Sequence, residues 1–453
     1  MLDQQYFGAS QYLPYLNKHF ILVRAVNDEE AGEKLYEQYK VRGTPTVLIA
    51  KPDGSEIDRV VGFGDADRFQ EDLDEAFQGE NNFINLLAKN KKNSDDLLTA
   101  FLLARKYDSR YDNEMSEKAV DLYERVLKKA DEAKTIAVPP SVSKEEVSLY
   151  EHAKFDLAQA KWYMNLVNAR ERQPIELIEF TKEFPKSPLM KQAYGALFNY
   201  YLRYAPADEA KSFFEDILEK YPEEPDLLFY YVRYCKQKNT DLDRGAEAAE
   251  KMVELSHRSI PYYVRQYAEI LAAKGDTTKL YKEYGNNYIN GKIRDLLSDL
   301  SYYATFWLQR GENLENALEM IQIAMKNDPE NSDYKSCAAA IYLKMGKEDE
   351  ALAIFGPAFI QDRMDKSRDL YAYANFWARE EKNLESALVA AKKAVELSPQ
   401  PYIWNALASV HWKLKNYEEA KKALEEAVDL QPSTKYYRDQ LKKLKEEMEK
   451  AKK

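Results

Sequence analysis

The sequence predicts an α+β N-terminal part followed by a long all-α array of repeated helix pairs. Two observations lead to this prediction. Before Gln78, short β-branched runs alternate with amphipathic stretches, whereas strand-like runs are almost absent after it. The later part instead repeats small residues and prolines at steps of about 34 residues, which is typical of stacked helix pairs.

Length and charge narrow the class of protein further. A chain of 453 residues exceeds what one hydrophobic core usually serves, so we expect more than one unit. The net charge is -11, and acidic and basic residues are well mixed, which argues against a nucleic-acid partner. No apolar run approaches the roughly 18 residues of a membrane span, and Met1 is not followed by a secretion signal. As written, the sequence predicts a cytoplasmic protein.

The first 80 residues predict the order helix, strand, helix, strand, hairpin, strand, helix. The strands include the β-branched runs Phe20–Val26 and Pro45–Ala50, and Glu29–Val41 between them is amphipathic. The sequence KPDG at Lys51–Gly54 places proline and glycine where a tight turn favours them. The stretch Asp65–Gly79 closes this part as a helix.

The sequence VRGTPTVLIAKPDGSEIDRVVGF, at Val41–Phe63, resembles the second half of the thioredoxin fold. In that family the proline that corresponds to Pro45 follows a cis peptide bond, and the backbone of the preceding residue, here Thr44, pairs with an extended substrate. The resemblance therefore implies a thioredoxin-like domain over residues 1–80. It also implies that Thr44 and Pro45 bind peptide.

The start of the chain departs from the thioredoxin pattern, because Met1 falls where a Cys-x-x-Cys pair should end. The strand that precedes this pair in the family lies between the equivalents of Phe20–Val26 and Pro45–Ala50. Two interpretations stay open: a truncated reading frame, or a degenerate domain that re-pairs its strands and caps the helices. Under either interpretation the chain has no redox catalyst, and Cys235 and Cys337 are expected to be buried packing residues.

Near the C-terminus, the stretch Tyr402–Pro432 resembles the tetratricopeptide repeat position by position. The matching residues are Trp404, Leu407, Ala408, His411, Ala420, Leu424, Ala427 and Pro432. The small residues and prolines return upstream at Ala387, Ala394 and Pro399, at Ala351, Phe355 and Ala358, and at Ala317, Ala324 and Pro329. The resemblance implies a right-handed solenoid, with divergent repeats over 81–292 and regular repeats plus a capping helix over 293–453.

The first helices of the regular repeats carry an unusually aromatic row. Its members are Tyr302, Phe306, Phe376, Tyr402, Asn405 and Trp412. Aromatic-lined grooves accept extended or helical peptides, so the row predicts a peptide-binding groove. The alternative is that these aromatics pack between repeats, because the chain has 34 tyrosines throughout.

Other chemistry is sparse. The four histidines are dispersed and form no metal-binding pair, and the sequence predicts neither a cofactor nor a metal site. The first function class is a redox-inactive scaffold for protein or peptide partners, and its oligomeric state stays open. The alternative is a thiol-disulfide oxidoreductase whose Cys-x-x-Cys segment lies upstream of Met1, with repeats that recruit substrates. An upstream signal peptide would move the expected location to the cell envelope.

Overall fold

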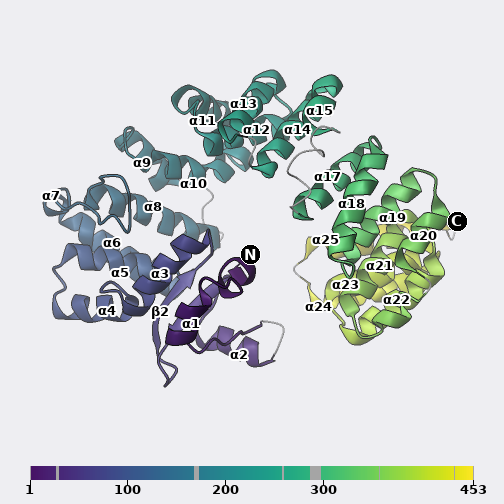
Figure 1. Cartoon of the computed structure of the whole chain (residues 1–453), viewed down its shortest axis with the longest axis horizontal. Helices are drawn as coiled ribbons and strands as arrows, with labels where there is room; N and C mark the ends of the chain where they lie inside the picture. The colour runs from purple at the N-terminus through teal and green to yellow at the C-terminus, as the bar shows by residue number, and fades with distance from the viewer. Residues whose placement is uncertain are drawn as a thin grey trace. The chain divides into compact units, whose positions relative to one another are not determined.

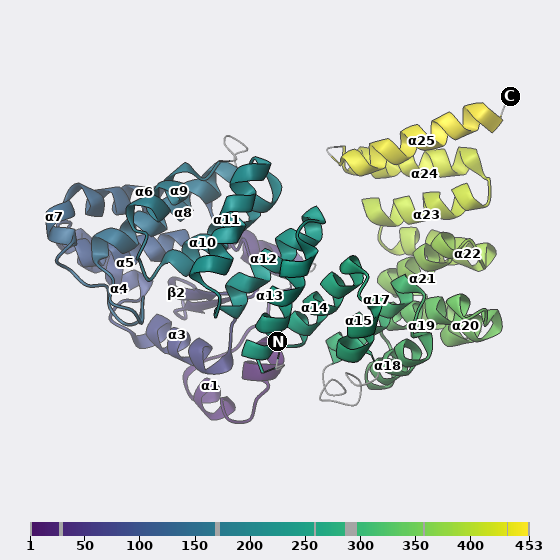
Figure 2. The same ribbon diagram turned by 90° about the horizontal axis from the view of Figure 1, so that it is seen from above.

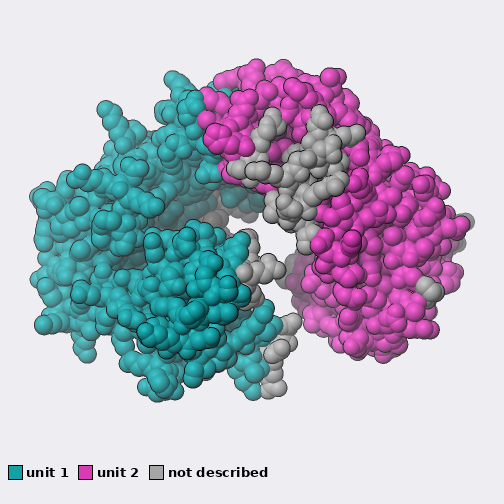
Figure 3. All heavy atoms as spheres, in the orientation of Figure 1, with its two compact units in different colours: residues 1–234 teal, residues 235–453 magenta. Residues whose placement is uncertain are grey.

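The computed structural model describes residues 2–26, 30–167, 173–257, 260–285, 297–356, 358–432 and 434–451. The chain forms two compact units, Met1–Tyr234 and Cys235–Lys453 (Figure 3). These units do not coincide with the boundaries that the sequence suggests at residues 80 and 292, and residue 292 lies outside the described residues.

The N-terminal region of the first unit contains short helices and one hairpin (Figure 1). Its elements are η1 (Asp3–Phe7), α1 (Leu13–His19), α2 (Glu30–Gln38), β1 (Thr46–Ala50), β2 (Glu56–Val61) and α3 (Ala66–Gln78). The strands are antiparallel, and Leu48 lies opposite Arg59. Gly54 turns the chain between them with a φ of +82°, a backbone conformation that glycine adopts without strain. The predicted hairpin and closing helix are therefore confirmed.

The predicted strand at Phe20–Val26 is wrong, because these residues form neither a helix nor a strand. The sheet contains only β1 and β2 among the described residues. Ile21, Leu22 and Val23 are 94%, 51% and 80% exposed. An extended run forms a strand only when another strand offers ladder hydrogen bonds, and no such neighbour lies beside this run in the described N-terminal region. A two-stranded sheet does not establish the thioredoxin-like domain.

Aromatic and aliphatic side chains hold the N-terminal region together. The buried members of this cluster are Tyr6, Leu16, Ile49, Val60, Phe69, Leu73 and Ala76. They come from η1, α1, both strands and α3, so the hairpin is covered on one face by helices. The ring of Phe69 lies 4.7 Å from the ring of Tyr6 and 5.5 Å from that of Phe63.

Charged residues of β2 attach the hairpin to the helices that follow. Asp58 is 1% exposed and pairs with Lys106 at 2.5 Å, while Glu56 accepts hydrogen bonds from Arg59 and Arg110. The Arg110 guanidinium also lies 4.0 Å from the ring centre of Phe83. Removing one partner of a buried ion pair leaves the other charge uncompensated, so these contacts fix the hairpin against the helices.

The rest of the first unit is helical. Its helices are α4 (Phe83–Lys92), α5 (Leu97–Asp108), α6 (Asn113–Lys128), α7 (Ala130–Ala133), α8 (Leu149–Val167), α9 (Ile175–Glu183), α10 (Met190–Arg203), α11 (Ala207–Lys220) and most of α12 (Pro225–Lys238). Asp96, Asp112 and Asn82 cap α5, α6 and α4 by accepting a backbone N–H of the first turn.

The second unit consists of helices, and Figure 2 shows α21 to α25 stacked on one another. Its helices are the end of α12, α13 (Leu242–Leu255), α14 (Pro261–Lys274), α15 (Thr277–Tyr284), α17 (Leu297–Arg310), α18 (Leu314–Asn327), α19 (Ser332–Lys344), α20 (Glu348–Phe355), η3 (Gln361–Arg363), α21 (Ser367–Glu380), α22 (Leu384–Leu397), α23 (Pro401–Lys413), α24 (Tyr417–Leu430) and α25 (Lys435–Ala451). None of the described helices of the protein is both long enough and apolar enough to cross a membrane.

Alanines lie where the helices of a pair approach each other. Ala317, Ala324, Ala387, Ala394 and Ala420 are fully buried. A methyl side chain permits two helix axes to come close, and a proline or a polar turn then ends the second helix. The packing role that the sequence predicts for these alanines is therefore confirmed.

The second helix of one repeat is shorter than its sequence suggests. We expected Ala358 to belong to this helix, but α20 ends at Phe355. Gly356 follows with a φ of +75°, which leaves the helical conformation. The side chain of Phe359 fills the space beside the shortened helix. Its ring stacks on that of Tyr373, with ring centres 5.2 Å apart, and is almost completely buried.

A group of ionisable side chains lies where α5, α6 and α8 meet in the first unit. Arg105 donates to Asp156 at 2.6 Å, and His152 Nδ1 lies 3.3 Å from the same carboxylate oxygen. Burial opposes ionisation of Asp156, but Arg105 and His152 outweigh this effect and lower its pKa. Burial, together with the charge of Asp156, raises the pKa of Asp108 from 3.8 to about 7.

This raised pKa predicts a stability that falls as pH rises from 3.8 to about 7 and that levels off at higher pH. Within this range the folded state keeps a proton at Asp108 that the unfolded state has released, so the free energy of unfolding decreases with rising pH until Asp108 is ionised in both states. In Asp108→Asn the loss disappears, and we expect the variant to exceed the wild type at pH 8 by about 2 kcal/mol in free energy of unfolding. Urea titrations followed by circular dichroism at pH 5 and pH 8 measure the difference.

The matched control is Asp95→Asn, since Asp95 lies just before α5 and its side chain is 81% exposed. It should leave the pH dependence of the wild type unchanged. Equal pH dependence in Asp108→Asn and the wild type would contradict the raised pKa.

Candidate protein-interaction surface

The first helices of four successive repeats form the candidate surface. These helices, α17, α19, α21 and α23, contact one another in sequence order, and each also packs against the second helix of its own pair. Side chains that the pair does not bury are therefore presented side by side along the first helices. This arrangement extends over the second unit alone.

Two of the predicted groove residues are exposed. Tyr302 of α17 is 53% exposed, and the guanidinium of Arg265 from α14 lies 4.0 Å from its ring centre. Tyr402 of α23 is 43% exposed and meets Tyr371 of α21 edge to face, with ring centres 4.9 Å apart. Asn405 is partly buried on α23.

The prediction that Phe376 lines an open groove is wrong, because its side chain is only 3% exposed. Its ring contacts Trp377 and Phe355, the latter from the preceding repeat, with ring centres 4.8 and 5.8 Å apart. Phe306 occupies the same place in its own repeat, 5.2 Å from Tyr284 of the preceding pair, and is partly buried. Both side chains pack between repeats, which is the alternative that the sequence left open.

Trp412 is held by the last helix. Its Nε1 donates to a carboxylate oxygen of Glu447 at 2.9 Å, and the hydroxyl of Tyr417 donates to the other oxygen at 3.2 Å. Glu447 belongs to α25, whose Leu444 and Met448 also join the core of the second unit. Trp412, which the sequence places in a groove, therefore helps to hold α25.

The structure does not bring the six predicted residues into one row. Tyr302 lies beside Arg265, whereas Tyr402 lies in a separate tyrosine cluster, defined as Tyr371, Tyr402, Tyr436 and Tyr437. Burial and then the neighbouring tyrosines raise the pKa of Tyr371. Tyr436 is 54% exposed, so this cluster presents aromatic surface from α21, α23 and α25. Sequence reasoning missed Tyr371, although it occupies in α21 the position that Asn405 occupies in α23.

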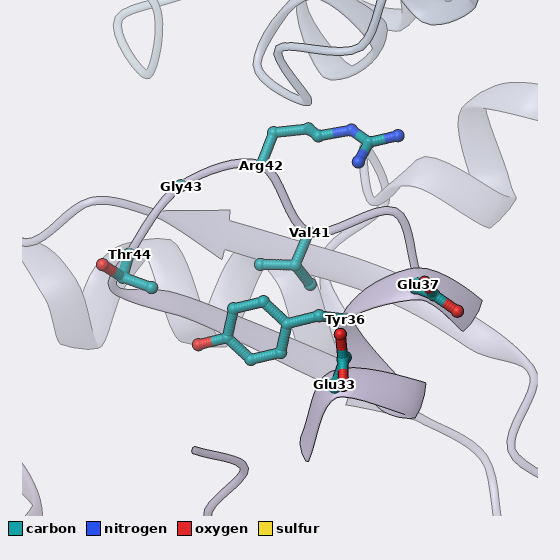
Figure 4. Close-up of a pocket in the computed structure, with 7 residues that line it drawn as sticks. All are labelled: Glu33, Tyr36, Glu37, Val41, Arg42, Gly43 and Thr44. Carbon is teal, nitrogen blue, oxygen red and sulfur yellow. The ribbon is translucent and has the colours of Figure 1, made fainter. Parts of the chain in front are cut away.

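The predicted peptide-binding residues Thr44 and Pro45 lie in the first unit, where the bond between them is cis. A cavity of about 360 Å³ opens beside Thr44 (Figure 4). Helix α2 contributes Glu33, Tyr36 and Glu37 to its wall. The loop that leads to β1 contributes the other lining residues, Val41, Arg42 and Gly43.

The remaining groups of chemical interest are the candidate metal ligands and the two cysteines. No group of three His, Cys, Asp or Glu side chains among the described residues could hold a metal ion. Burial raises the pKa of the Cys337 thiol to about 11, and burial lowers the pKa of His411. Cys235 is fully buried. Cys235 is therefore buried as expected, whereas Cys337 is only partly buried.

Comparison with known proteins supports the repeat assignment at the C-terminus. A family model described as tetratricopeptide repeat matches residues 401–434. The predicted repeat is confirmed in this segment. It covers α23 and α24, the pair that contributes Tyr402 and Asn405. No curated protein matches the chain.

Several solved structures are similar at low identity. Yeast Tom70 is 15% identical with a TM-score of 0.38 and aligns over 84% of this chain and 87% of its own. A tetratricopeptide repeat protein from Parabacteroides merdae is 15% identical with a TM-score of 0.35, over 59% and 97%. YrrB, described as a TPR protein with an unusual peptide-binding site, is 17% identical with a TM-score of 0.23, over 51% and 97%. Scores below 0.5 carry no inference about function.

The buried and the exposed aromatic residues should differ in how much stability is lost when the side chain is truncated. Phe376→Ala should lower the free energy of unfolding by about 3 to 5 kcal/mol, because it opens a cavity between repeats. Tyr402→Ala should lower it by less than about 1 kcal/mol, since the side chain is exposed. Urea titration of both variants beside the wild type measures the difference, and similar losses would contradict the assignment.

Proposed function

We propose that the chain is a scaffold that binds protein or peptide partners through the first helices of its C-terminal repeats. The observation that supports this most directly is the tyrosine cluster, in which exposed aromatic surface is contributed by α21, α23 and α25. Tyrosine combines a large apolar ring with a hydroxyl and is enriched among residues that dominate binding energy. Solenoids generally use the surface formed by neighbouring repeats for binding.

The proposed partner meets this surface with an apolar side chain against the rings and polar groups around them. Tyr371, Tyr402 and Tyr436 supply hydroxyls that both donate and accept hydrogen bonds. Phe306, Phe376 and Trp412 are not part of the proposed binding surface. The two phenylalanines pack between repeats, and Trp412 holds α25. The cytoplasmic location favoured by the sequence remains part of this proposal.

The N-terminal region is proposed to serve the scaffold as an accessory part, with Thr44 and Pro45 available for peptide contact as the thioredoxin resemblance implies. Its attachment through Lys106 and Arg110 to α5 and the following turn supports a fixed position within the first unit. Thiol-disulfide exchange is not proposed for the chain as written, because it carries only Cys235 and Cys337, and no Cys-x-x-Cys pair.

Site-specific photo-crosslinking tests the proposed surface. With a photoreactive amino acid at position 402, we expect capture of a partner from native cell extract that is not captured from position 389. Val389 is the matched control, because it is 56% exposed but lies on the second helix α22. The double variant Tyr371→Ala, Tyr402→Ala should then weaken the purified partner's affinity by about 2 kcal/mol, or roughly 30-fold. Equal capture at both positions, with unchanged affinity, would overturn the proposal.

An insulin reduction assay tests the expectation that the chain does not catalyse thiol-disulfide exchange. With dithiothreitol present, the chain should not accelerate the reaction above the dithiothreitol background. The thiol of Cys337 is mostly protonated at neutral pH because burial raises its pKa to about 11, and Cys235 is buried. Acceleration that is lost in Cys235→Ser or in Cys337→Ser would show that this prediction is wrong.

A further inference from the structure

Strand β1 has an unpaired edge. It pairs with β2 on one side, and the described N-terminal region offers no strand on the other. Its sequence, TVLIA, is apolar and rich in β-branched residues, with no proline or charged side chain. Native proteins usually protect an exposed edge strand with prolines or charged side chains. An edge that lacks them is a template for pairing with another chain.

The hydrogen-bond pattern identifies the groups on this edge. Gly62 donates its N–H to the carbonyl of Pro45 at 2.9 Å, which fixes the side of β1 that faces β2. Along an antiparallel strand, the N–H and C=O groups of successive residues point alternately toward the partner strand and away from it. Since Pro45 bonds to β2, the backbone groups of Thr46 and Leu48 point away from β2. In the described residues, no backbone hydrogen bond to another element satisfies them.

A second run in the same region also lacks strand partners. Ile21, Leu22 and Val23 are mostly exposed, although the adjacent Phe20 packs on Phe77 with ring centres 4.7 Å apart. Three consecutive exposed apolar residues are unfavourable in water unless another surface covers them. The region therefore contains strand-forming sequence without enough strands to pair with it.

Charge near one end of β1 indicates which side chains an added strand would need. Glu33 and Glu37 lie one helical turn apart on α2 and line the cavity beside Thr44 (Figure 4). Arg42 also contributes to the wall, but its side chain points away from both glutamates and pairs with Asp112 at 3.4 Å. Among the described lining residues, two carboxylates thus face the cavity while Arg42 is turned toward Asp112, which favours a lysine or arginine side chain as the ligand.

We propose that the free edge of β1 binds an extended peptide segment as an added strand. The segment has alternating apolar residues along Thr46 and Leu48, and a basic residue that enters the cavity beside Glu33 and Glu37. Main-chain hydrogen bonds provide affinity in this mode, and side-chain pockets provide selectivity. This proposal extends the peptide contact proposed for Thr44 and Pro45 and does not involve the tyrosine cluster of the second unit, so it and the tyrosine-cluster proposal can fail independently.

A labelled synthetic peptide, Lys-Val-Thr-Val-Thr-Val-Lys with blocked ends, tests the site on the full chain. Lysine at both ends permits either strand direction. Fluorescence anisotropy should detect saturable binding, which we expect to weaken at least tenfold when the central valine is replaced by proline or both lysines by glutamate. Equal binding of all three peptides, or of none, would overturn the proposal.

Protein variants locate the binding site. Leu48→Pro removes an N–H that points outward, so it should abolish binding while β1 still pairs with β2. Glu33→Lys with Glu37→Lys should weaken binding at least tenfold, whereas Glu71→Lys, an exposed change on α3 in the same unit, should not. If Leu48→Pro does not fold, the charge variants and the proline peptide still decide the outcome.

Hydrogen exchange gives a readout that is independent of affinity. Peptide binding should slow exchange of the Thr46 and Leu48 amides and leave the amides of α23 unchanged. Protection confined to the second unit would overturn the assignment. A concentration-dependent dimer that the peptide does not dissociate would also overturn it, because the edge would then belong to a second copy of the chain.

Discussion

A pair of amphipathic helices cannot bury both of its apolar faces by itself, and the second unit depends on how neighbouring pairs cover each other. Ala387 and Ala394 of α22 are fully buried where that helix meets its neighbours. Their small size permits close approach, and Phe376 and Trp377 of α21 then fill the space toward the preceding repeat. Helix α25 covers the pair α23 and α24 through Leu444, Met448 and the contacts of Glu447.

The same constraint acts on the hairpin of the first unit. A two-stranded sheet is marginal alone and needs cover on its faces and partners for its edges. Helices α1 and α3 cover one face, and the buried Asp58 of β2 is paired by Lys106 of α5. The hairpin is therefore stabilised by helices that the sequence pattern assigns to a different part of the chain. The outer edge of β1 has no strand partner among the described residues of this region.

Spacing of small residues was sufficient to predict the helix pairs, because their contacts lie within one repeat and are steric in origin. The strand at Phe20–Val26 could not be decided in this way, since a β run requires a partner that may be distant in sequence. Phe376 and Trp412 were assigned to a groove because aromatic composition does not distinguish surface from packing. Their actual contacts, Phe355 and Glu447, come from the preceding repeat and from the capping helix.

The turns within the pairs help to separate the two kinds of aromatic residue. Asn313 and Asn383 adopt positive φ before α18 and α22, and each donates its side-chain amide to the tyrosine ten residues earlier, Tyr303 or Tyr373. Both tyrosines are buried. Ten residues after Tyr371 and Tyr402 the chain has Glu381 and Trp412 instead. Tyr303 and Tyr373, each followed at this distance by such an asparagine, are thus fixed as packing residues, whereas Tyr402, which lacks it, is 43% exposed.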